Sequence, residues 1–564
     1  MLRRLYAVIL GGWVACLTVG ASASDSVEGR GSVPVDIVIC LDTSGSMSDL
    51  IDSARGRIWN LVTELAKAKP TPRLRVGLLS YGTPETSTAE QGWVVRQIDL
   101  TDDLDALYAK LMALTTNGGD EFVGWVLSDA VETMSWSSDE RALRLIYVAG
   151  NESADQGADQ RNFRYVAEKA RGLNIIINPI YAGGREQGIL ELWDQVAQHA
   201  GGDYVSIDVK EGTRQIATPY DIELLILNQE LNATYIPYGS KGAEGIANQI
   251  AQDTNAGNLG AQSCGSRVAA KGCSLYNNAA WDLVDAVRGE GFSLTELKPE
   301  ELPESLRSLT PEERKSYVEG MRAVRTAVQA RIQETNTKRE LLIRAERIRD
   351  GSRELSLDDA MIQSLRTQAE AAKFTFPPRP TATPVEVVSS KSGSSAPLPQ
   401  PFQANLDALI ASLPTVKYRV GSYETRHQEF ATPLVEHTGQ AVSYAVEQET
   451  FASKPPAEER LIVRLLHHAK ELQTIQEVQL NDSPFVYTKN GAAAPTATVR
   501  YRLGGLEFPD QARAEMALKR IGEEISKLEG TPQESSPIAT AQFLRQKIRV
   551  IAETSAQVFR QTGC

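Results

Sequence analysis

The sequence predicts an α/β fold, with a doubly wound and mostly parallel sheet, followed by a helical extension and a separate α+β domain. From Val33 to about Tyr235, short apolar runs alternate with segments of helical period, as in α/β domains, and the first domain is predicted at residues 33–210. The run Val35–Leu41 is almost continuously apolar, which is typical of a parallel strand covered on both faces. Residues 211–375 mostly show the helical period, and residues 402–564 combine apolar, strand-like runs with segments of helical period.

Each further strand of the α/β region is predicted from an apolar run, and each helix from apolar residues three and four positions apart. The helix after the first strand has Ile51, Ile58, Leu61, Val62 and Leu65 on one side. The other predicted strands are Arg73–Tyr81, Trp93–Leu100, Leu143–Val148, Asn174–Ile180 and Tyr204–Ile207. The other predicted helices are at about Asp103–Ala113, Glu121–Met134, Phe163–Ala170 and Leu190–His199.

A long helix is predicted to begin at Thr310-Pro311-Glu312-Glu313, because a Thr cap, a Pro in the first position and an acid at the third mark helix starts. It runs without Pro to Asp350, and one apolar stripe along it must be covered. The stripe consists of Val318, Met321, Val324, Val328 and Ile332. A second helix, at about Leu357–Ala371, could complete a hairpin that packs on the α/β domain; a coiled-coil dimer is the alternative.

Proline, serine and threonine recur through residues 376–401, which predicts an exposed linker. In the domain beyond it, strands are predicted at Val416–Val420, Ala441–Val446 and Thr496–Arg502. Helices are predicted at Ala457–Gln473, Gln511–Lys527 and Ile538–Gln561. No motif there indicates chemistry. Its histidines lack metal-ligand spacing, so they are interpreted as surface residues: His427, His437, His467 and His468.

Residues 1–23 are interpreted as a secretory signal peptide. Two arginines precede an apolar stretch from Leu5 to about Val19, too short for a comfortable membrane span, and Ala21-Ser22-Ala23 offers a cleavage site. An uncleaved anchor and, more weakly, a lipoprotein at Cys16 are the alternatives. No later stretch approaches 18 consecutive apolar residues, so we expect an exported chain, periplasmic or extracellular, without a transmembrane span once mature.

Composition excludes several classes of protein. The 564 residues allow about three or four domains, and 42% hydrophobic residues argue against wholesale disorder or many membrane spans. A formal charge of −13 argues against a general nucleic-acid binder, which needs a basic face.

Five cysteines are too few for a disulfide scaffold of this size. Because export permits disulfides, Cys264 and Cys273 are expected to close a short loop, with two reduced thiols as the alternative. Cys40 lies inside an apolar strand and is interpreted as a buried thiol. Cys564 is either free or available for an intermolecular bond.

The most informative motif is Asp42-Thr43-Ser44-Gly45-Ser46, at the end of the first predicted strand. Ligands of open parallel sheets collect at the carboxyl ends of the strands. A carboxylate and two hydroxyls that converge there form the all-oxygen set preferred by hard divalent cations such as Mg²⁺. The alternative is a turn and helix cap, which also favour Ser and Asp.

This motif and its position resemble the metal-ion-dependent adhesion site, or MIDAS, of the von Willebrand factor A (VWA) domain family. Asp42, Ser44 and Ser46 match the Asp-x-Ser-x-Ser motif, and the resemblance covers about Val33 to Ile207. It implies a Rossmann-like fold and a bound Mg²⁺, or else Mn²⁺ or Ca²⁺. The family takes another ligand from a second loop, usually a Thr after two glycines. Here Asp120 occupies that position.

The third loop departs from the family pattern, which ends a strand with Thr-Asp-Gly. Ala149 stands where that Asp is expected, so Asn151 or Glu152 is expected to replace it, or the third arm is absent. Asp42 and Asp120 together carry the charge of the family's two aspartates. We therefore infer that the second carboxylate has moved to the second loop. Alternatively, Asp120 and the residue after it only stabilise the N-terminus of the next helix.

Other segments resemble a group of exported bacterial proteins that carry a VWA domain, and the resemblance implies no activity. These segments are Ala149–Glu152, Leu231–Gly239 and Trp281–Ala286.

The expected function is an adhesion-type module rather than an enzyme. A cation held by Asp42, Ser44, Ser46, Asp120 and Asn151 would receive an Asp or Glu side chain of a protein partner. A metal-free envelope-assembly scaffold is the alternative. A metal-dependent hydrolase is less favoured: only Glu121 and Glu152 are candidate bases, and G-x-S-x-G, H-E-x-x-H and P-loop motifs are absent.

Overall fold

The structure is a computed structural model. It describes residues 32–83, 87–157, 161–207, 216, 218–289, 291–349, 357–378, 409, 412–479, 499–504, 506–528 and 537–561. The predictions of a signal peptide at 1–23, of a lipoprotein at Cys16 and of a role for Cys564 fall outside the described residues. So does most of the predicted linker at 376–401.

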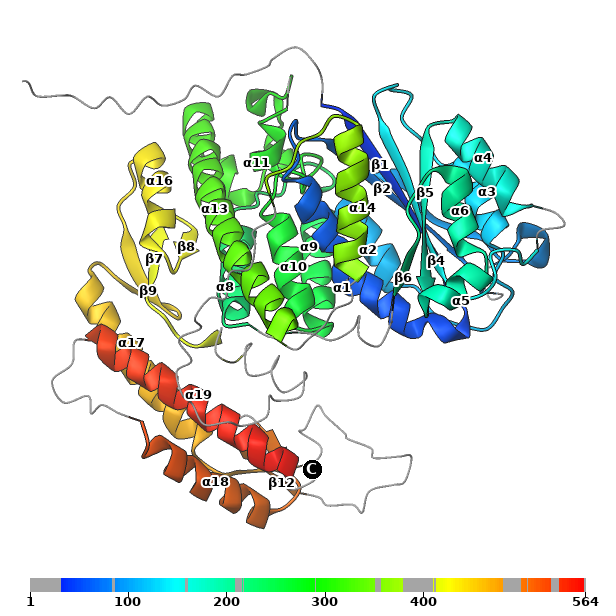
Figure 1. Cartoon of the computed structure of the whole chain (residues 1–564). Helices are drawn as coiled ribbons and strands as arrows, with labels where there is room; N and C mark the ends of the chain where they lie inside the picture. Colours follow the sequence, from blue (N-terminus) through cyan, green and yellow to red (C-terminus); the bar gives the residue numbers. More distant parts are fainter. Residues whose placement is uncertain are drawn as a thin grey trace, which may run out of the picture. The chain divides into compact units, whose positions relative to one another are not determined.

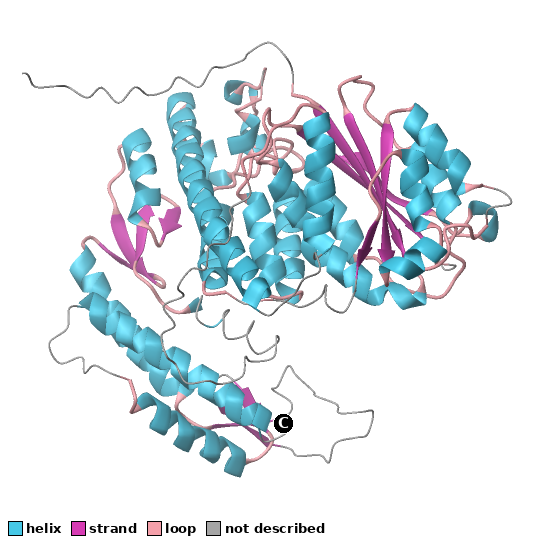
Figure 2. Cartoon of the chain, viewed as in Figure 1, coloured by secondary structure: helices cyan, strands magenta, loops and turns pink. Residues whose placement is uncertain are grey.

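A six-stranded sheet lies at the centre of the α/β region (Figure 2). Its strands are β1 (Pro34–Asp42), β2 (Arg73–Tyr81), β3 (Val95–Thr101), β4 (Leu143–Gly150), β5 (Ile175–Ala182) and β6 (Val205–Ile207). The spatial order is β3-β2-β1-β4-β5-β6, and β3 runs antiparallel to β2 while the other pairs are parallel. The predicted fold class, a doubly wound and mostly parallel sheet, is therefore confirmed. The carboxyl ends of β1, β2 and β4 meet at one edge, where Asp42 pairs with Tyr81 and Leu41 with Ala149.

Helices cover both faces of this sheet (Figure 1). One face carries α3 (Val123–Thr133), α4 (Phe163–Gly172) and α6 (Trp193–Ala200), and the short α5 (Arg185–Leu190) precedes α6. The other face carries α1 (Ser48–Leu65), α2 (Leu104–Met112) and α14 (Leu357–Ala371). Alternate side chains of β1 enter the two cores: Ile37 and Ile39 enter one, and Val38 and Cys40 the other. This confirms the strand predicted to be buried on both faces.

The helical region begins after the sheet. Its elements are α8 (Tyr220–Asn232), α9 (Gly242–Asn258), α10 (Ala261–Lys271), α11 (Leu283–Ala286), α12 (Glu304–Arg307) and α13 (Pro311–Arg349). The predicted cap of α13 is confirmed: the Thr310 amide donates to Glu313 (2.8 Å), whose own amide donates to the Thr310 hydroxyl (3.3 Å). Its apolar stripe is buried against α8, α10 and a C-terminal helix, α16 (Gln428–Thr438), of the same chain, so it needs no second copy to cover it.

The helix α14 packs on α1 and beside β6, so it completes the cover of the sheet. Arg366 of α14 forms an ion pair with Glu64 of α1. Beyond the helix, Thr375 and Lys69 exchange two backbone hydrogen bonds, of 2.8 and 2.9 Å. The hairpin of both helices stays a prediction: α14 packs on the α/β region, whereas α13 packs mainly within the helical region.

Two segments far apart in the sequence, 231–239 and 281–286, come together in the helical region. The amide of Leu283 donates to the Ile236 carbonyl (2.9 Å), and the Ile236 amide donates to a carboxylate oxygen of Asp282 (2.7 Å). Arg325 of α13 reaches the same place and donates to Asp282 (2.6 Å) and to Asp285 (2.9 Å). All three charged side chains are buried, so this cluster ties α13 to both segments.

A second buried ion cluster joins the helical region to the α/β region. Arg267 of α10 is 1% exposed and donates to Asp105 of α2 and to Asp253 of α9, each at 2.7 Å. Its guanidinium also lies 4.8 Å from the centre of the Trp59 ring on α1. One cation therefore bonds to carboxylates from both regions.

The C-terminal part contains two small antiparallel sheets, of order β10-β9-β7-β8 and β11-β12-β13. The strands are β7 (Lys417–Val420), β8 (Tyr423–Thr425), β9 (Ser443–Val446), β10 (Glu449–Phe451), β11 (Gln476–Gln479), β12 (Val499–Leu503) and β13 (Leu506–Phe508). The helices are α16 (Gln428–Thr438), α17 (Lys454–Leu472), α18 (Gln511–Ile525) and α19 (Pro537–Gln561). The predicted α+β character is confirmed, and α17, α18 and α19 share a core of their own.

The disulfide expected between Cys264 and Cys273 is wrong, because both are buried free thiols. Cys264 lies on α10 and Cys273 just beyond the helix end. At 1.5 Å of rise per residue, nine positions along a helical path separate them by roughly 13 Å. A disulfide requires Cα atoms within about 7 Å.

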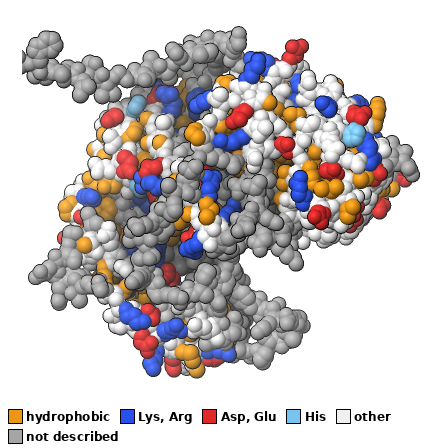
Figure 3. Space-filling view, in the orientation of Figure 1, with side chains coloured by type: hydrophobic (Ala, Val, Ile, Leu, Met, Phe, Trp, Pro, Cys, Tyr) orange, Lys and Arg blue, Asp and Glu red, His pale blue; other side chains and the backbone are white. Residues whose placement is uncertain are grey.

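Among the described residues, no helix is both long and apolar enough to cross a membrane. On the face drawn in Figure 3, acidic and basic side chains are interspersed.

Candidate metal centre

The Asp-x-Ser-x-Ser turn begins where β1 ends. Asp42 is completely buried, and its Oδ1 accepts a hydrogen bond from the Ser44 amide (2.7 Å). Ser44 precedes a short 3₁₀ turn, Gly45–Met47, which leads into α1. The Ser44 and Ser46 hydroxyls lie 3.2 Å apart. The turn therefore brings together the carboxylate and both hydroxyls that the sequence predicted.

Thr43, which lies between Asp42 and Ser44 in the sequence, holds the turn against the neighbouring strand β2. Its amide and its hydroxyl both donate to the Tyr81 carbonyl, at 2.8 Å each. Its own carbonyl accepts from the Thr83 hydroxyl (2.9 Å) and from the Asn117 amide (3.0 Å) of the second loop. Sequence reasoning missed Thr43 and Thr83, because a bare Thr carries no signal of a positioning role.

The second loop presents a different acid from the one predicted. Asp120 is exposed, whereas its neighbour Glu121 is 7% exposed, with its amide donating to the Gln156 side chain (3.2 Å). The side chains of Glu121 and Asp42 both pack against Gly82. A Cβ added to this glycine would lie 3.0 Å from Asp42 Oδ1 and 3.2 Å from Glu121 Cγ. Glu121 and Asp42 therefore pack on the same small space.

One carboxylate oxygen of each of these two acids has no hydrogen-bond partner. Asp42 Oδ2 and Glu121 Oε2 are both buried and accept nothing from the described residues. An ionised carboxylate removed from water and left unpaired is costly. A buried, unpaired oxygen on each of two neighbouring carboxylates is what a cation site requires, and a helix cap would leave neither unpaired.

The electrostatics of the pair follow from this arrangement. Burial and then the charge of Glu121 raise the pKa of Asp42 to about 8, against a smaller lowering by the Ser44 amide. Burial also raises the pKa of Glu121 to about 7, opposed by a hydrogen bond from Ser44 and assisted by the charges of Glu152 and Asp120. Without a cation, the two carboxyls therefore resist ionising together.

The third loop completes the rim. Ala149 is buried, and its carbonyl accepts from the Tyr81 hydroxyl (3.0 Å), so it offers no side-chain ligand. Asn151 reaches the site instead, with its amide nitrogen 3.0 Å from the Ser46 hydroxyl. Glu152 is exposed and contributes its charge, while the Trp193 indole donates to its carbonyl (2.7 Å).

The predicted residues Asp42, Ser44, Ser46 and Asn151 thus lie together, and Asp120 lies at the exposed rim beside Glu121. Among the described residues, no group of three or more His, Cys, Asp and Glu side chains is spaced to hold a metal. Hydroxyl or amide oxygens would therefore have to complete any metal set here. A set of carboxylate, hydroxyl and amide oxygens fits a hard divalent cation.

Over about a third of its length, the chain is similar to solved VWA-domain structures. Proximal thread matrix protein 1 from the mussel byssus, with a zinc-occupied MIDAS motif, is 12% identical at a TM-score of 0.24. The VWF domain of the type V pilus tip protein Mfa5 from Porphyromonas gingivalis is 14% identical at a TM-score of 0.24. A von Willebrand factor type A protein from Catenulispora acidiphila is 16% identical, also at 0.24.

Each match covers 32% of this chain. It covers 43% of the mussel chain, 92% of the Mfa5 domain and 40% of the Catenulispora chain, so this chain spans less than half of two of them. What these proteins bind is a property of each of them and assigns no ligand to this chain. No sequence-defined family matches the chain, and no curated protein matches it in sequence.

Proposed function

We propose that the chain is an exported binding module that holds a divalent cation, Mg²⁺ or else Mn²⁺ or Ca²⁺, at the carboxyl edge of its sheet. Asp42, Ser44, Ser46 and Asn151 supply oxygens, and Glu121 supplies the second carboxylate. Asp120, which the sequence favoured for that role, lies one residue earlier at the rim. The cation is then the point at which an acidic side chain of a protein partner binds.

The observation that carries this proposal is the pair of buried oxygens, Asp42 Oδ2 and Glu121 Oε2, without hydrogen-bond partners. A divalent cation would neutralise both carboxylates and so offset the burial and the nearby negative charge that raise their pKa values. Ser46 is exposed at the end of the turn, so the site opens to solvent on that side. A partner's carboxylate could approach the cation from there, through charge-assisted coordination.

Calorimetric titration of the full chain with Mg²⁺, Mn²⁺ and Ca²⁺ tests the metal. We expect one bound cation in the wild type and none in Asp42→Ala, because that change removes a carboxylate which nothing nearby can replace. Glu121→Gln should weaken binding by about 10- to 100-fold, the range found when a buried charged hydrogen-bonding group is lost.

Asp120→Asn is the matched control, because it removes the same charge one residue away from an exposed position. We expect it to weaken cation binding less than about fivefold, as for a solvated charge. The opposite result, a large loss of cation affinity in Asp120→Asn with little change in Glu121→Gln, would show that Asp120 supplies the second carboxylate. Binding that persists in Asp42→Ala would overturn the proposed site.

The partner is tested separately, once a cation is shown to bind. The immobilised wild-type chain is incubated with an envelope extract in Mg²⁺, and captured proteins are eluted with EDTA. A partner that binds through the cation should elute in EDTA and should be missing from the Asp42→Ala column. Its capture should also be lost when its own candidate Asp or Glu is changed to Asn or Gln. Equal capture in EDTA and Mg²⁺ would contradict the proposal and favour the metal-free scaffold.

A further inference from the structure

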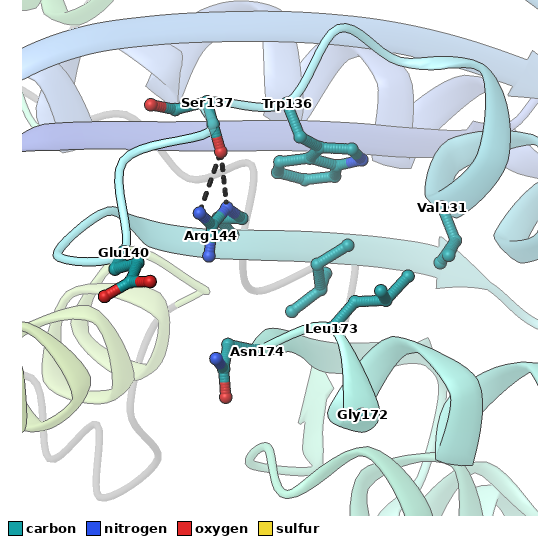
Figure 4. Close-up of a pocket in the computed structure, with 9 residues that line it drawn as sticks. Val131, Trp136, Ser137, Glu140, Arg144, Gly172, Leu173 and Asn174 are labelled. Atoms are coloured by element: carbon teal, nitrogen blue, oxygen red, sulfur yellow. Dashed lines mark hydrogen bonds between the residues drawn. The ribbon is translucent and has the colours of Figure 1, made fainter.

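A cavity lies at the edge of the sheet opposite the candidate metal centre, where β4 and β5 begin (Figure 4). It has a volume of about 600 Å³, within the range of roughly 300–1,000 Å³ that is typical of small-molecule sites. Its walls come from α3, the segment between α3 and β4, the first residues of β4 and the turn between α4 and β5. The lining residues that carry the inference are Val131, Trp136, Glu140, Arg144 and Leu173.

The feature that points to a ligand is Arg144, whose side chain is nine-tenths buried and carries a permanent charge. Its Nε and Nη2 donate to the Ser137 carbonyl (3.0 and 2.8 Å), and Nη2 also donates to the Asp139 carbonyl (2.7 Å). These acceptors are neutral, and within the described residues no carboxylate lies at ion-pair distance from Arg144. The nearby Asp139 carboxylate is held by Arg141 (2.7 Å).

The remaining nitrogen, Nη1, is therefore the unused part of the guanidinium. In Figure 4, one nitrogen of Arg144 points away from Ser137 toward the open side between Glu140 and Asn174. Among the described residues, the charge of Arg144 is met by backbone carbonyls and, at longer range, by the Asp139 carboxylate, so Nη1 keeps hydrogen-bonding capacity for a ligand. A bound carboxylate could accept both Nη1 hydrogens.

The other walls indicate the rest of the ligand. Trp136 is fixed by its indole nitrogen, which donates to the Ala130 carbonyl (2.9 Å), and its ring lines the cavity beside Leu173 and Val131. These side chains offer an apolar surface next to the charged group. Glu140 is exposed at the rim and offers a carboxylate on the same side as Arg144.

We propose that this cavity binds a free hydrophobic α-amino acid. Its carboxylate pairs with Arg144, its ammonium with Glu140, and its side chain packs on Trp136 and Leu173. The site is independent of the cation site, since the two lie at opposite edges of the sheet.

Calorimetry on the full chain with three probes tests the assignment: L-phenylalanine, 3-phenylpropionate, which lacks the ammonium, and phenethylamine, which lacks the carboxylate. We expect phenylalanine to bind, phenylpropionate to bind about two- to fivefold more weakly because Glu140 is solvated, and phenethylamine not to bind. Equal binding of phenethylamine and phenylalanine, or no binding of any probe, would overturn the proposal.

Variants identify the residues. Arg144→Gln should weaken phenylalanine binding by about 10- to 100-fold, whereas Arg322→Gln, at an exposed arginine of α13 that does not line the cavity, should not change it. Glu140→Gln should weaken phenylalanine but leave phenylpropionate unchanged, and an equal effect on both would refute the ammonium contact. If Arg144→Gln fails to fold, Leu173→Asp takes its place: this side chain is half exposed, and a charge there should abolish binding without unfolding the chain.

Discussion

Replacing Arg325 with methionine is expected to destabilise the helical region by about 3–5 kcal/mol, the cost found when one partner of a buried ion pair is removed. Arg325 is 3% exposed and donates to Asp282, Asp285, the Thr234 hydroxyl (3.0 Å) and the Thr234 carbonyl (2.8 Å). It also lies 4.0 Å from the centre of the Tyr235 ring. Methionine fills much of the space but leaves two buried carboxylates without the cation that pairs with them.

Urea unfolding of the full chain, followed by near-ultraviolet circular dichroism, measures this loss. Arg322→Met is the matched control, because Arg322 lies one turn earlier on α13, is half exposed and, among the residues that the structure describes, forms an ion pair with Glu319 alone. It should change the free energy of unfolding by less than about 1 kcal/mol. Adding Asp282→Asn to Arg325→Met should recover part of the stability, since it removes one stranded charge. Equal effects of Arg322→Met and Arg325→Met would show that the cluster is not what stabilises this region.

Changing Asp42 to asparagine is expected to stabilise the metal-free protein at pH 8 while it abolishes cation binding. In the fold, the Asp42 and Glu121 carboxyls have pKa values of about 8 and about 7, whereas an unfolded carboxyl titrates near pH 4. Between about pH 4 and pH 8 the folded chain therefore holds more protons than the unfolded chain. The contribution of these two groups to the free energy of unfolding is therefore greatest below about pH 4, and it falls as the pH rises to about 8.

Thermal unfolding in EDTA at pH 5, 6.5 and 8 tests whether the stability of the metal-free protein falls as the pH rises. The wild type should lose several degrees of Tm across this range through these two groups, and Asp42→Asn should lose less and melt higher at pH 8. Mg²⁺ should raise the Tm of the wild type at pH 8 and leave that of Asp42→Asn unchanged. Asp120→Asn, which keeps the buried pair, should follow the wild-type pH profile. A wild-type Tm in EDTA that rises from pH 5 to pH 8 would contradict the buried pair.

Much of the fold could be predicted from local patterns. The strand β2 begins and ends at the predicted residues, and the α13 cap and its apolar stripe lie where the sequence placed them. These signals are local, because hydrophobic period and cap chemistry depend on neighbours a few residues apart. The place of α14 was only partly predictable. Its contacts with α1 and β6 join residues about 150 to 300 positions apart in the sequence.

In the candidate site, too, some residues could be predicted from the local sequence and others could not. Asp42, Ser44 and Ser46 followed from a motif within one turn, and the structure brings them together. In the second loop, a difference of one residue decides which carboxylate turns inward, and loop backbone angles follow no periodic pattern. The packing against Gly82 and Gln156 places Glu121 inside, and neither neighbour could be inferred from the motif.

The position of α14 has a consequence for the order in which the protein can be made. A ribosome or export channel releases the chain from its N-terminus, so β1 to β6 emerge long before Leu365 and Ala369, which cover part of the sheet. The side-chain amide of Asn178 on β5 likewise cannot donate its hydrogen bond to Gln368 until that residue, 190 positions later, has emerged. Until about Thr375 has emerged, the part of this sheet face that α14 covers stays exposed, and a holding factor that masks it would be needed most during that interval.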